Sequence, residues 1–234
     1  MKTFKLPLLL LCLLISVNSV RSQNVVPGSE KLLDKLRLNK VMHGIEYETY
    51  ETTVGDPFLY KDFHEGEIIF KNGETFNLNL RYDIYADQVH LKDNNLIYGI
   101  IHPEALASVS IDTLKLLYCS FVKSPADQSS EAGYFILKTD GKCKLLVRKN
   151  IRIQDAEPPK GLQEARPTRF VAVGDTYYLR QEGKSAAVRI NGKKYLLTVL
   201  EDRKEEINRL IKSEKLNAKN EADLTKIVTF YNSL

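Results

Sequence analysis

Hydrophobic and polar residues alternate along most of the chain with the two-residue period of half-buried β-strands. The clearest stretch runs from Gly66 to Lys92 and predicts three consecutive antiparallel strands, with turns at residues 72–73 and 86–88. One face of the middle strand is apolar and consists of Phe76, Leu78, Leu80, Tyr82 and Ile84. The other face is polar and consists of Asn77, Asn79, Arg81 and Asp83. We therefore expect this strand to be the framework of a β-sheet.

Similar patterns predict further short strands separated by turns, of which the clearest are Asp140-Gly141 and Asn191-Gly192. These strands are expected over residues 96–101, 107–111, 115–123, 134–138, 144–148, 170–173, 176–180, 185–190 and 193–200. Residues 124–131 are polar and rich in serine, which is typical of a loop. Residues 154–169 contain three prolines and predict an extended crossing segment or a flap over the sheet.

After Leu200 the pattern changes to the period of amphipathic helices. Asp202 followed by Glu205 is typical of a capping box at the start of one helix. Asn220 followed by Asp223 indicates the start of a second helix. Each helix has one apolar stripe, so we expect both to pack on each other and on the sheet.

These patterns predict an α+β fold that is mostly β. The expected architecture is an antiparallel meander curled into a roll, sandwich or partial barrel, with a C-terminal helical hairpin. The expected segments are a leader over 1–22, an N-terminal lead-in over 23–45, an antiparallel β domain over 46–200 and a helical segment over 201–234 packed on it. The lead-in includes a short leucine-rich helix over 29–38, and a first strand is expected over 45–53.

The first 22 residues have the pattern of a secretory signal peptide. Lys2 and Lys5 precede an apolar run over 6–17, which is shorter than the ~20 residues of a membrane-spanning helix. No later apolar run reaches that length. We expect an exported chain, located in the periplasm, associated with the outer membrane or extracellular.

Removal of the leader changes the charge of the chain. The leader has three basic residues and no acidic one, which leaves 31 basic and 30 acidic residues in the remainder. A net charge near zero argues against nucleic acid as a partner. The expected partners are another envelope protein or a small polar ligand.

Two cysteines follow the leader, Cys119 and Cys143. The predicted strands that carry them flank a common middle strand, which would hold them too far apart for a disulfide unless the sheet curls. The sequence leaves both a disulfide and two buried free thiols open and favours the free thiols.

Four motifs resemble an uncharacterised family of small secreted bacterial proteins. They are Gly55-x-Pro57-Phe58-Leu59, Phe63-x-x-Gly66, the run Leu80-Arg81-Tyr82-Asp83-Ile84-Tyr85, and the ending Asn220-Glu-x-Asp-Leu with Tyr231-Asn-Ser-Leu234. The resemblance covers most of the chain after the leader. It implies export and a β-rich body with a helical tail, and it implies no activity or cofactor.

Motifs for common cofactors and catalytic groups are incomplete in this sequence. His64-Glu65 begins like a zinc-binding HExxH motif, but position 68 is Ile and the second histidine is missing. Gly183-Lys184-Ser185 resembles the end of a P-loop, but position 178 is Tyr where a glycine is required. We therefore expect no catalytic, metal-binding or cofactor-binding residues.

One group of residues remains a weak candidate for ligand binding: Asn79, Arg81, Asp83 and His90. These side chains would share one face if His90 points the same way from the neighbouring strand. A curled sheet would then form a concave polar surface on which Arg81 could hold a carboxylate, a sugar or a peptide terminus. The favoured alternative is a solvated face on which Arg81 and Asp83 pair locally.

Aromatic and basic residues are also interleaved between positions 177 and 194, which could form a surface for polyanions. Alternating strands joined by polar turns give the same pattern and are the favoured explanation.

The sequence favours a non-enzymatic, envelope-associated binding or structural module of unknown ligand. The alternative is a hydrolase with a site assembled from distant residues, acting on envelope or imported material. A cleft with two carboxylates or a buried His–Asp pair would favour the enzyme. A shallow surface with satisfied polar residues would favour the module. A subunit of a larger envelope complex is a third possibility.

Overall fold

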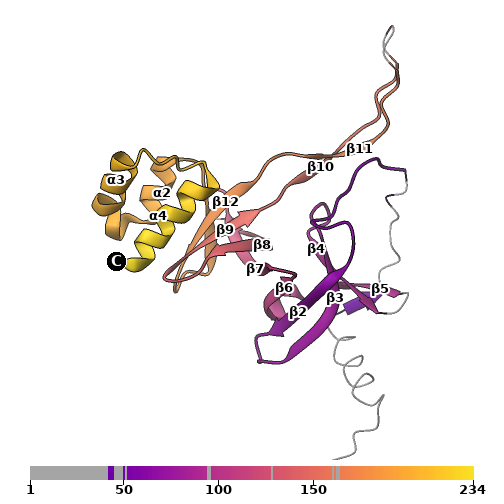
Figure 1. Cartoon of the computed structure of the whole chain (residues 1–234), viewed down its shortest axis with the longest axis horizontal. Helices are drawn as coiled ribbons and strands as arrows, with labels where there is room; N and C mark the ends of the chain where they lie inside the picture. Colours follow the sequence, from indigo (N-terminus) through magenta and orange to yellow (C-terminus); the bar gives the residue numbers. More distant parts are fainter. Residues whose placement is uncertain are drawn as a thin grey trace, which may run out of the picture. The chain divides into compact units, whose positions relative to one another are not determined.

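The computed structural model describes residues 42–44, 50, 52–93, 96–127, 129–159, 161 and 164–234 (Figure 1). The strands are β1 (Met42–Gly44), β2 (His64–Phe70), β3 (Thr75–Asp83), β4 (Gln88–Asp93), β5 (Leu96–Ile100), β6 (Leu106–Ile111), β7 (Leu114–Val122), β8 (Glu131–Thr139), β9 (Cys143–Arg148), β10 (Ile151–Gln154), β11 (Arg169–Ala172), β12 (Thr176–Gln181) and β13 (Ala186–Ile190). The helices are α2 (Lys193–Val199), α3 (Lys204–Ser213) and α4 (Glu221–Ser233), with short 3-10 helices η1 (Pro103–Ala105) and η2 (Glu201–Arg203). The predicted mostly-β fold with C-terminal helices is confirmed.

Within the described residues, eleven strands form one sheet in the order β1-β5-β4-β3-β2-β6-β7-β13-β12-β9-β8. Strands β2 to β5 form an antiparallel meander, and the chain then returns to place β6 on the free edge of β2. The predicted Asn72-Gly73 turn joins β2 to β3, with Gly73 at φ +89°. Glycine adopts this left-handed conformation without steric cost.

Strands β7, β8, β9, β12 and β13 close into a five-stranded barrel because β13 pairs with β7. The pairings between consecutive members are antiparallel, and the closing pair is parallel. Strands that alternate in direction can close an odd-numbered ring only through one parallel pair. The sequence predicted a roll, sandwich or partial barrel, and the structure forms a closed barrel.

Strand β7 belongs to both the N-terminal sheet and the barrel. Leu114–Leu116 pair with β6, whereas Ser120–Val122 pair with β13 on the same edge of the strand. The other edge of β7 pairs with β8. A single long strand therefore joins the two parts of the sheet covalently and through hydrogen bonds.

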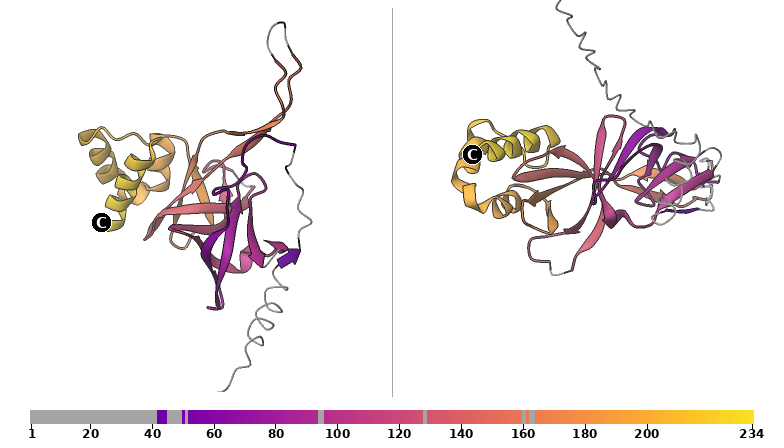
Figure 2. Two further views of the ribbon diagram at one scale, coloured as in Figure 1. Left: turned by 45° about the vertical axis from the view of Figure 1, so that its right-hand side comes forward. Right: turned by 90° about the horizontal axis from the view of Figure 1, so that it is seen from below.

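The described apolar side chains form three buried clusters. The first lies between the N-terminal sheet and the outer surface of the barrel and includes Leu80, Ile111 and Ile136. The second fills the barrel and includes Leu117, Phe135 and Tyr178. The third lies between the helices and the barrel and includes Leu179, Leu196 and Ile227. Figure 2 shows the helices gathered beside β9 and β12, away from the N-terminal sheet.

The prediction that residues 193–200 form a strand is wrong, because this segment is helix α2. Leu196 and Leu200 are both fully buried and are four residues apart, so they share one face of a helix. Gly192 at φ +98° turns the chain directly into the helix instead of into a returning strand. The helical part therefore begins earlier than the sequence pattern suggested.

The predicted capping box at Asp202 is wrong. Residues 201–203 form η2, α3 begins at Lys204, and its first turn receives no side-chain cap. The Asp202 carboxylate instead accepts the Tyr231 hydroxyl, with both oxygens 3.0 Å from it. The second predicted start is confirmed, because the Asn220 side chain accepts the Asp223 N–H at the start of α4.

The two cysteines are free and buried. They lie on β7 and β9, which flank β8, as the sequence predicted. Cys119 belongs to the cluster inside the barrel, whereas Cys143 belongs to the cluster under the helices. The barrel wall therefore separates the two thiols. The predicted leader, the helix over 29–38 and most of the strand over 45–53 lie outside the described residues.

Candidate functional site

The four candidate residues from the sequence do not share one environment. Asn79 is exposed and lines a shallow groove of about 530 Å³. The other lining residues are Glu65, Gly66, Glu67, Asn77, Leu78, Ser110 and Asp112. Asp83 is buried at the end of β3, and His90 is buried on β4 opposite Arg81. Asn79 lies two residues before Arg81 on β3, but its side chain is exposed and faces the groove, whereas Asp83 and His90 are buried.

Arg81 lies between two aromatic rings. Its guanidinium carbon is 3.5 Å from the centre of the Phe58 ring and 4.4 Å from the centre of the Phe63 ring. Its Nη1 also donates a hydrogen bond to the Lys61 carbonyl oxygen at 3.2 Å. A planar guanidinium stacks well on aromatic faces, and such contacts contribute about 0.5–2 kcal/mol each. These contacts hold Arg81 against its own chain.

Asp83 is 1% exposed and accepts hydrogen bonds with both carboxylate oxygens. The Tyr50 hydroxyl donates to Oδ2 at 2.9 Å, and the Ala86 N–H donates to Oδ1 at 2.9 Å. Burial raises the pKa of Asp83, while the hydrogen bonds from Ala86 and Tyr50 oppose that rise. The carboxylate fixes the turn between β3 and β4.

His90 is 4% exposed and lies directly opposite Arg81 in the β3–β4 register. Its ring meets the Phe58 ring edge to face, with the ring centres 6.0 Å apart. Burial, together with the positive charge of Arg81, lowers the pKa of His90 to about 4. The imidazole is therefore neutral at physiological pH.

Residues 55–63, which we call the covering segment, lie over these polar groups. The Leu59 N–H donates to the Tyr82 carbonyl, and the Ile84 N–H donates to the Pro57 carbonyl, both at 2.9 Å. The segment thus forms hydrogen bonds with the end of β3 and places Phe58 over Arg81 and His90. The sequence did not predict this cover, because Gly55 and Pro57 indicate a turn without indicating where it packs.

The proline-containing segment over 154–169 forms a two-stranded projection instead of a flap. Strand β10 pairs antiparallel with β11, from Ile151 opposite Ala172 to Gln154 opposite Arg169. Further out, Glu157 and Arg166 exchange backbone hydrogen bonds of 2.8 and 2.9 Å. We call residues 151–172 the arm, and Figure 1 shows it leading away from the ends of β9 and β12.

The base of the arm is attached to the chain segment that precedes β2 and to the turn between β3 and β4. Val54 forms a parallel bridge with Arg169, with hydrogen bonds to Thr168 and Phe170. The Phe170 ring lies 5.0 Å from the Tyr50 ring and 5.4 Å from the Tyr85 ring, centre to centre. Tyr50 therefore links the arm to the buried Asp83 carboxylate.

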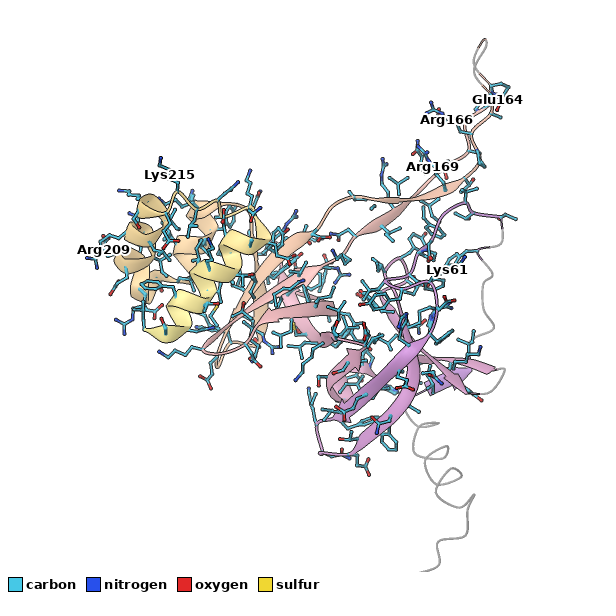
Figure 3. The ribbon with its side chains drawn as sticks, viewed as in Figure 1. Lys61, Glu164, Arg166, Arg169, Arg209 and Lys215 are labelled. Carbon is cyan, nitrogen blue, oxygen red and sulfur yellow. The ribbon has the colours of Figure 1, made fainter. Side chains whose placement is uncertain are left out.

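Exposed side chains lie on and beside the base of the arm. Val54, which bridges Arg169, is 55% exposed, and Val173, just beyond β11, is 57% exposed. Arg152 and Arg169 are also exposed. In Figure 3 the side chains of Arg166 and Arg169 project from the same side of the arm. Exposed apolar and basic side chains therefore lie near one another at the base of the arm.

The aromatic and basic residues between positions 177 and 194 do not form a common surface. Tyr178 packs inside the barrel, whereas Tyr177 packs on its outside. The favoured explanation, alternating strands joined by turns, accounts for this pattern.

Comparison with protein-family models, with curated proteins and with solved structures finds no significant match to this chain. In the part of the chain that the structure describes, no three His, Cys, Asp or Glu side chains gather closely enough to hold a metal ion. Over the same residues, no helix combines the length and apolar character needed to cross a membrane.

Proposed function

We propose that this protein is an exported, non-enzymatic module of the cell envelope that binds a partner protein through its arm. The observation that carries this proposal is the arm itself. It is a two-stranded ribbon with exposed arginines, it is flanked at its base by the exposed Val54 and Val173, and it is held there by the bridge between Val54 and Arg169. An isolated two-stranded ribbon is only marginally stable in water, so a partner would stabilise the outer part of the arm.

Two features suit the arm to specific docking instead of aggregation. Pro158, Pro159 and Pro167 lie in its outer part, and proline cannot donate a hydrogen bond to an added strand. Exposed charged residues of both signs, among them Arg152, Asp155 and Glu164, also suit docking through ion pairs with a partner.

The buried polar groups at the end of β3 support a module more than a hydrolase. Asp83 is held by Tyr50 and Ala86, and Arg81 stacks between two rings of the covering segment. A general base needs to reach a substrate proton, whereas these groups face the chain's own atoms. This arrangement corresponds to the satisfied polar residues that we expect of a binding module.

The proposal of export rests on the leader pattern over residues 1–22. Fractionation of the producing cells tests it. The protein should be recovered outside the cytoplasm and without its leader. Recovery in the cytoplasm with the leader intact would contradict export.

The role of the arm is tested with a variant in which Asn-Gly replaces residues 156–167 and serine replaces the exposed Arg152, Arg169 and Val173. This change keeps the paired base and supplies a two-residue hairpin turn. The tagged parent protein should recover one protein partner in a fixed ratio from envelope extracts, and the shortened variant should lose it while its circular dichroism spectrum stays unchanged. Equal recovery by both forms would contradict a role of the arm.

A further inference from the structure

The charged side chains at one end of the barrel are arranged in an unfavourable way. Arg180 of β12 lies directly opposite Lys144 of β9. Both side chains share the inner side of the barrel with Leu146 and Tyr178, because inward positions alternate along each strand. Like charges placed directly opposite each other in an antiparallel pair destabilise a sheet.

A third basic residue approaches the same end. Leu117 and Cys119 of β7 point into the barrel. Lys115 lies two residues before Leu117, so its side chain leaves β7 on the same face. Burial lowers the pKa of Lys144, and the charges of Arg180 and Lys115 lower it further. The positive charges of Arg180 and Lys115 therefore both act on Lys144.

Acidic groups neutralise this cluster only in part. Lys144 forms an ion pair with Asp140, and the negative charge of Glu182 opposes the lowering of the Lys144 pKa. Arg180 and Lys115 form no ion pair with any residue that the structure describes. Two positive charges therefore remain without an anionic partner there.

Small and neutral groups surround Arg180 inside the barrel. Ala187 of β13 has a small, fully buried side chain in the cluster that fills the barrel. The Arg180 side chain also contacts the Cys119 thiol, which burial keeps neutral by raising its pKa. The guanidinium is thus fixed at one edge, with donors left for another group.

We propose that this end of the barrel is a binding site for an oxyanion, a phosphate or carboxylate group, held by Arg180, Lys144 and Lys115. The anion would replace repulsion among the three cations with charge-assisted hydrogen bonds. A guanidinium can hold either type of group through two parallel hydrogen bonds. The site is independent of the arm, so it does not depend on the function proposed above.

Thermal unfolding of the purified protein in inorganic phosphate, in acetate and in chloride at equal ionic strength tests the proposal. Chloride controls for general screening of the charges. At least one oxyanion should raise the melting temperature more than chloride does, and the larger shift identifies the class of ligand. Equal shifts in all three salts would overturn the site.

The variants Arg180→Met and Lys144→Met separate binding from folding. Without oxyanion, Arg180→Met should be at least as stable as the parent, because it removes repulsion. In titration calorimetry it should weaken oxyanion binding about tenfold or more, as expected for a lost charge-assisted hydrogen bond. Arg209→Met, which removes an exposed charge on α3, serves as control and should bind like the parent (Figure 3). Unchanged binding by Arg180→Met would overturn the proposal.

Discussion

At the scale of single residues, the polar face of β3 is stabilised by contacts within the chain. Phe58 covers both Arg81 and His90, and burial keeps His90 neutral. The polar row itself could be predicted from alternation, because Arg81 and His90 occupy opposed positions as expected. Its cover could not, because the contact joins two segments whose relative position depends on the whole sheet.

The neutral state of His90 predicts a loss of stability in acid. Its pKa of about 4 in the folded protein lies below the usual 6.5, so the unfolded chain binds the proton more tightly. The contribution is fully present above pH 6.5 and is lost as the pH falls toward 4. At about 1.4 kcal/mol per pKa unit, it amounts to at most about 3 kcal/mol.

Urea unfolding at pH 7.5 and pH 4.5 measures this contribution. When the pH is lowered from 7.5 to 4.5, the free energy of unfolding should decrease less for His90→Gln than for the parent protein. Asp83 acts in the opposite direction, because its raised pKa favours the folded state at low pH, and both proteins retain it. An equal decline in the two proteins would show that His90 is not buried in the neutral form.

At the scale of elements, helix α4 is hydrogen-bonded to the turn between β8 and β9. The Asn232 side chain accepts the Cys143 N–H at 2.8 Å and donates to the carbonyls of Asp140 and Cys143 at 3.1 and 2.9 Å. These bonds join positions about ninety residues apart and explain why the helices pack on the barrel at this place. The helix could be predicted from its apolar stripe, but this contact could not.

Asn232→Ala should lower the free energy of unfolding by about 1–3 kcal/mol, because it leaves partly buried backbone groups without a partner. Ser233→Ala is the matched control, since that exposed hydroxyl bonds only within the helix. Chemical denaturation of both variants gives the comparison. Similar stabilities for the two variants would contradict the role of Asn232.

Helix α2 shows why local pattern alone can mislead. Asn191-Gly192 followed by apolar residues is typical of a hairpin, and the same apolar residues satisfy a helical period. The closed barrel favours the helix. Because β13 pairs with β7, the segment after β13 has no free strand edge there, and its apolar residues pack on the outside of the barrel. That closure joins strands far apart in sequence, which the pattern of each strand does not reveal.

At the scale of the whole described region, an ion pair links the N-terminal sheet to the barrel. Asp87, in the turn between β3 and β4, accepts Arg148 Nη2 at 2.9 Å. The Tyr82 hydroxyl and the Tyr134 N–H also donate to this carboxylate, at 2.7 and 3.2 Å. The Arg148 guanidinium lies over the Phe121 and Phe135 rings.

A double-mutant cycle with Asp87→Asn and Arg148→Met should give a coupling energy of about 1 kcal/mol or more, because both side chains are only about one-fifth exposed. The exposed pair Lys123–Glu131 is the control and should give about 0.5 kcal/mol or less. Urea unfolding of the parent, single and double variants supplies the values. Equal coupling in the two pairs would contradict a special role for Asp87.

The central claim is that the arm binds a partner protein, and site-specific photo-crosslinking in intact producing cells tests it most directly. A photoreactive amino acid replaces Ala165, an exposed residue of the arm, or Arg209, an exposed residue of α3. We expect one discrete protein adduct from position 165 and none of the same mass from position 209. No adduct from position 165, or the same adducts from both positions, would contradict the claim.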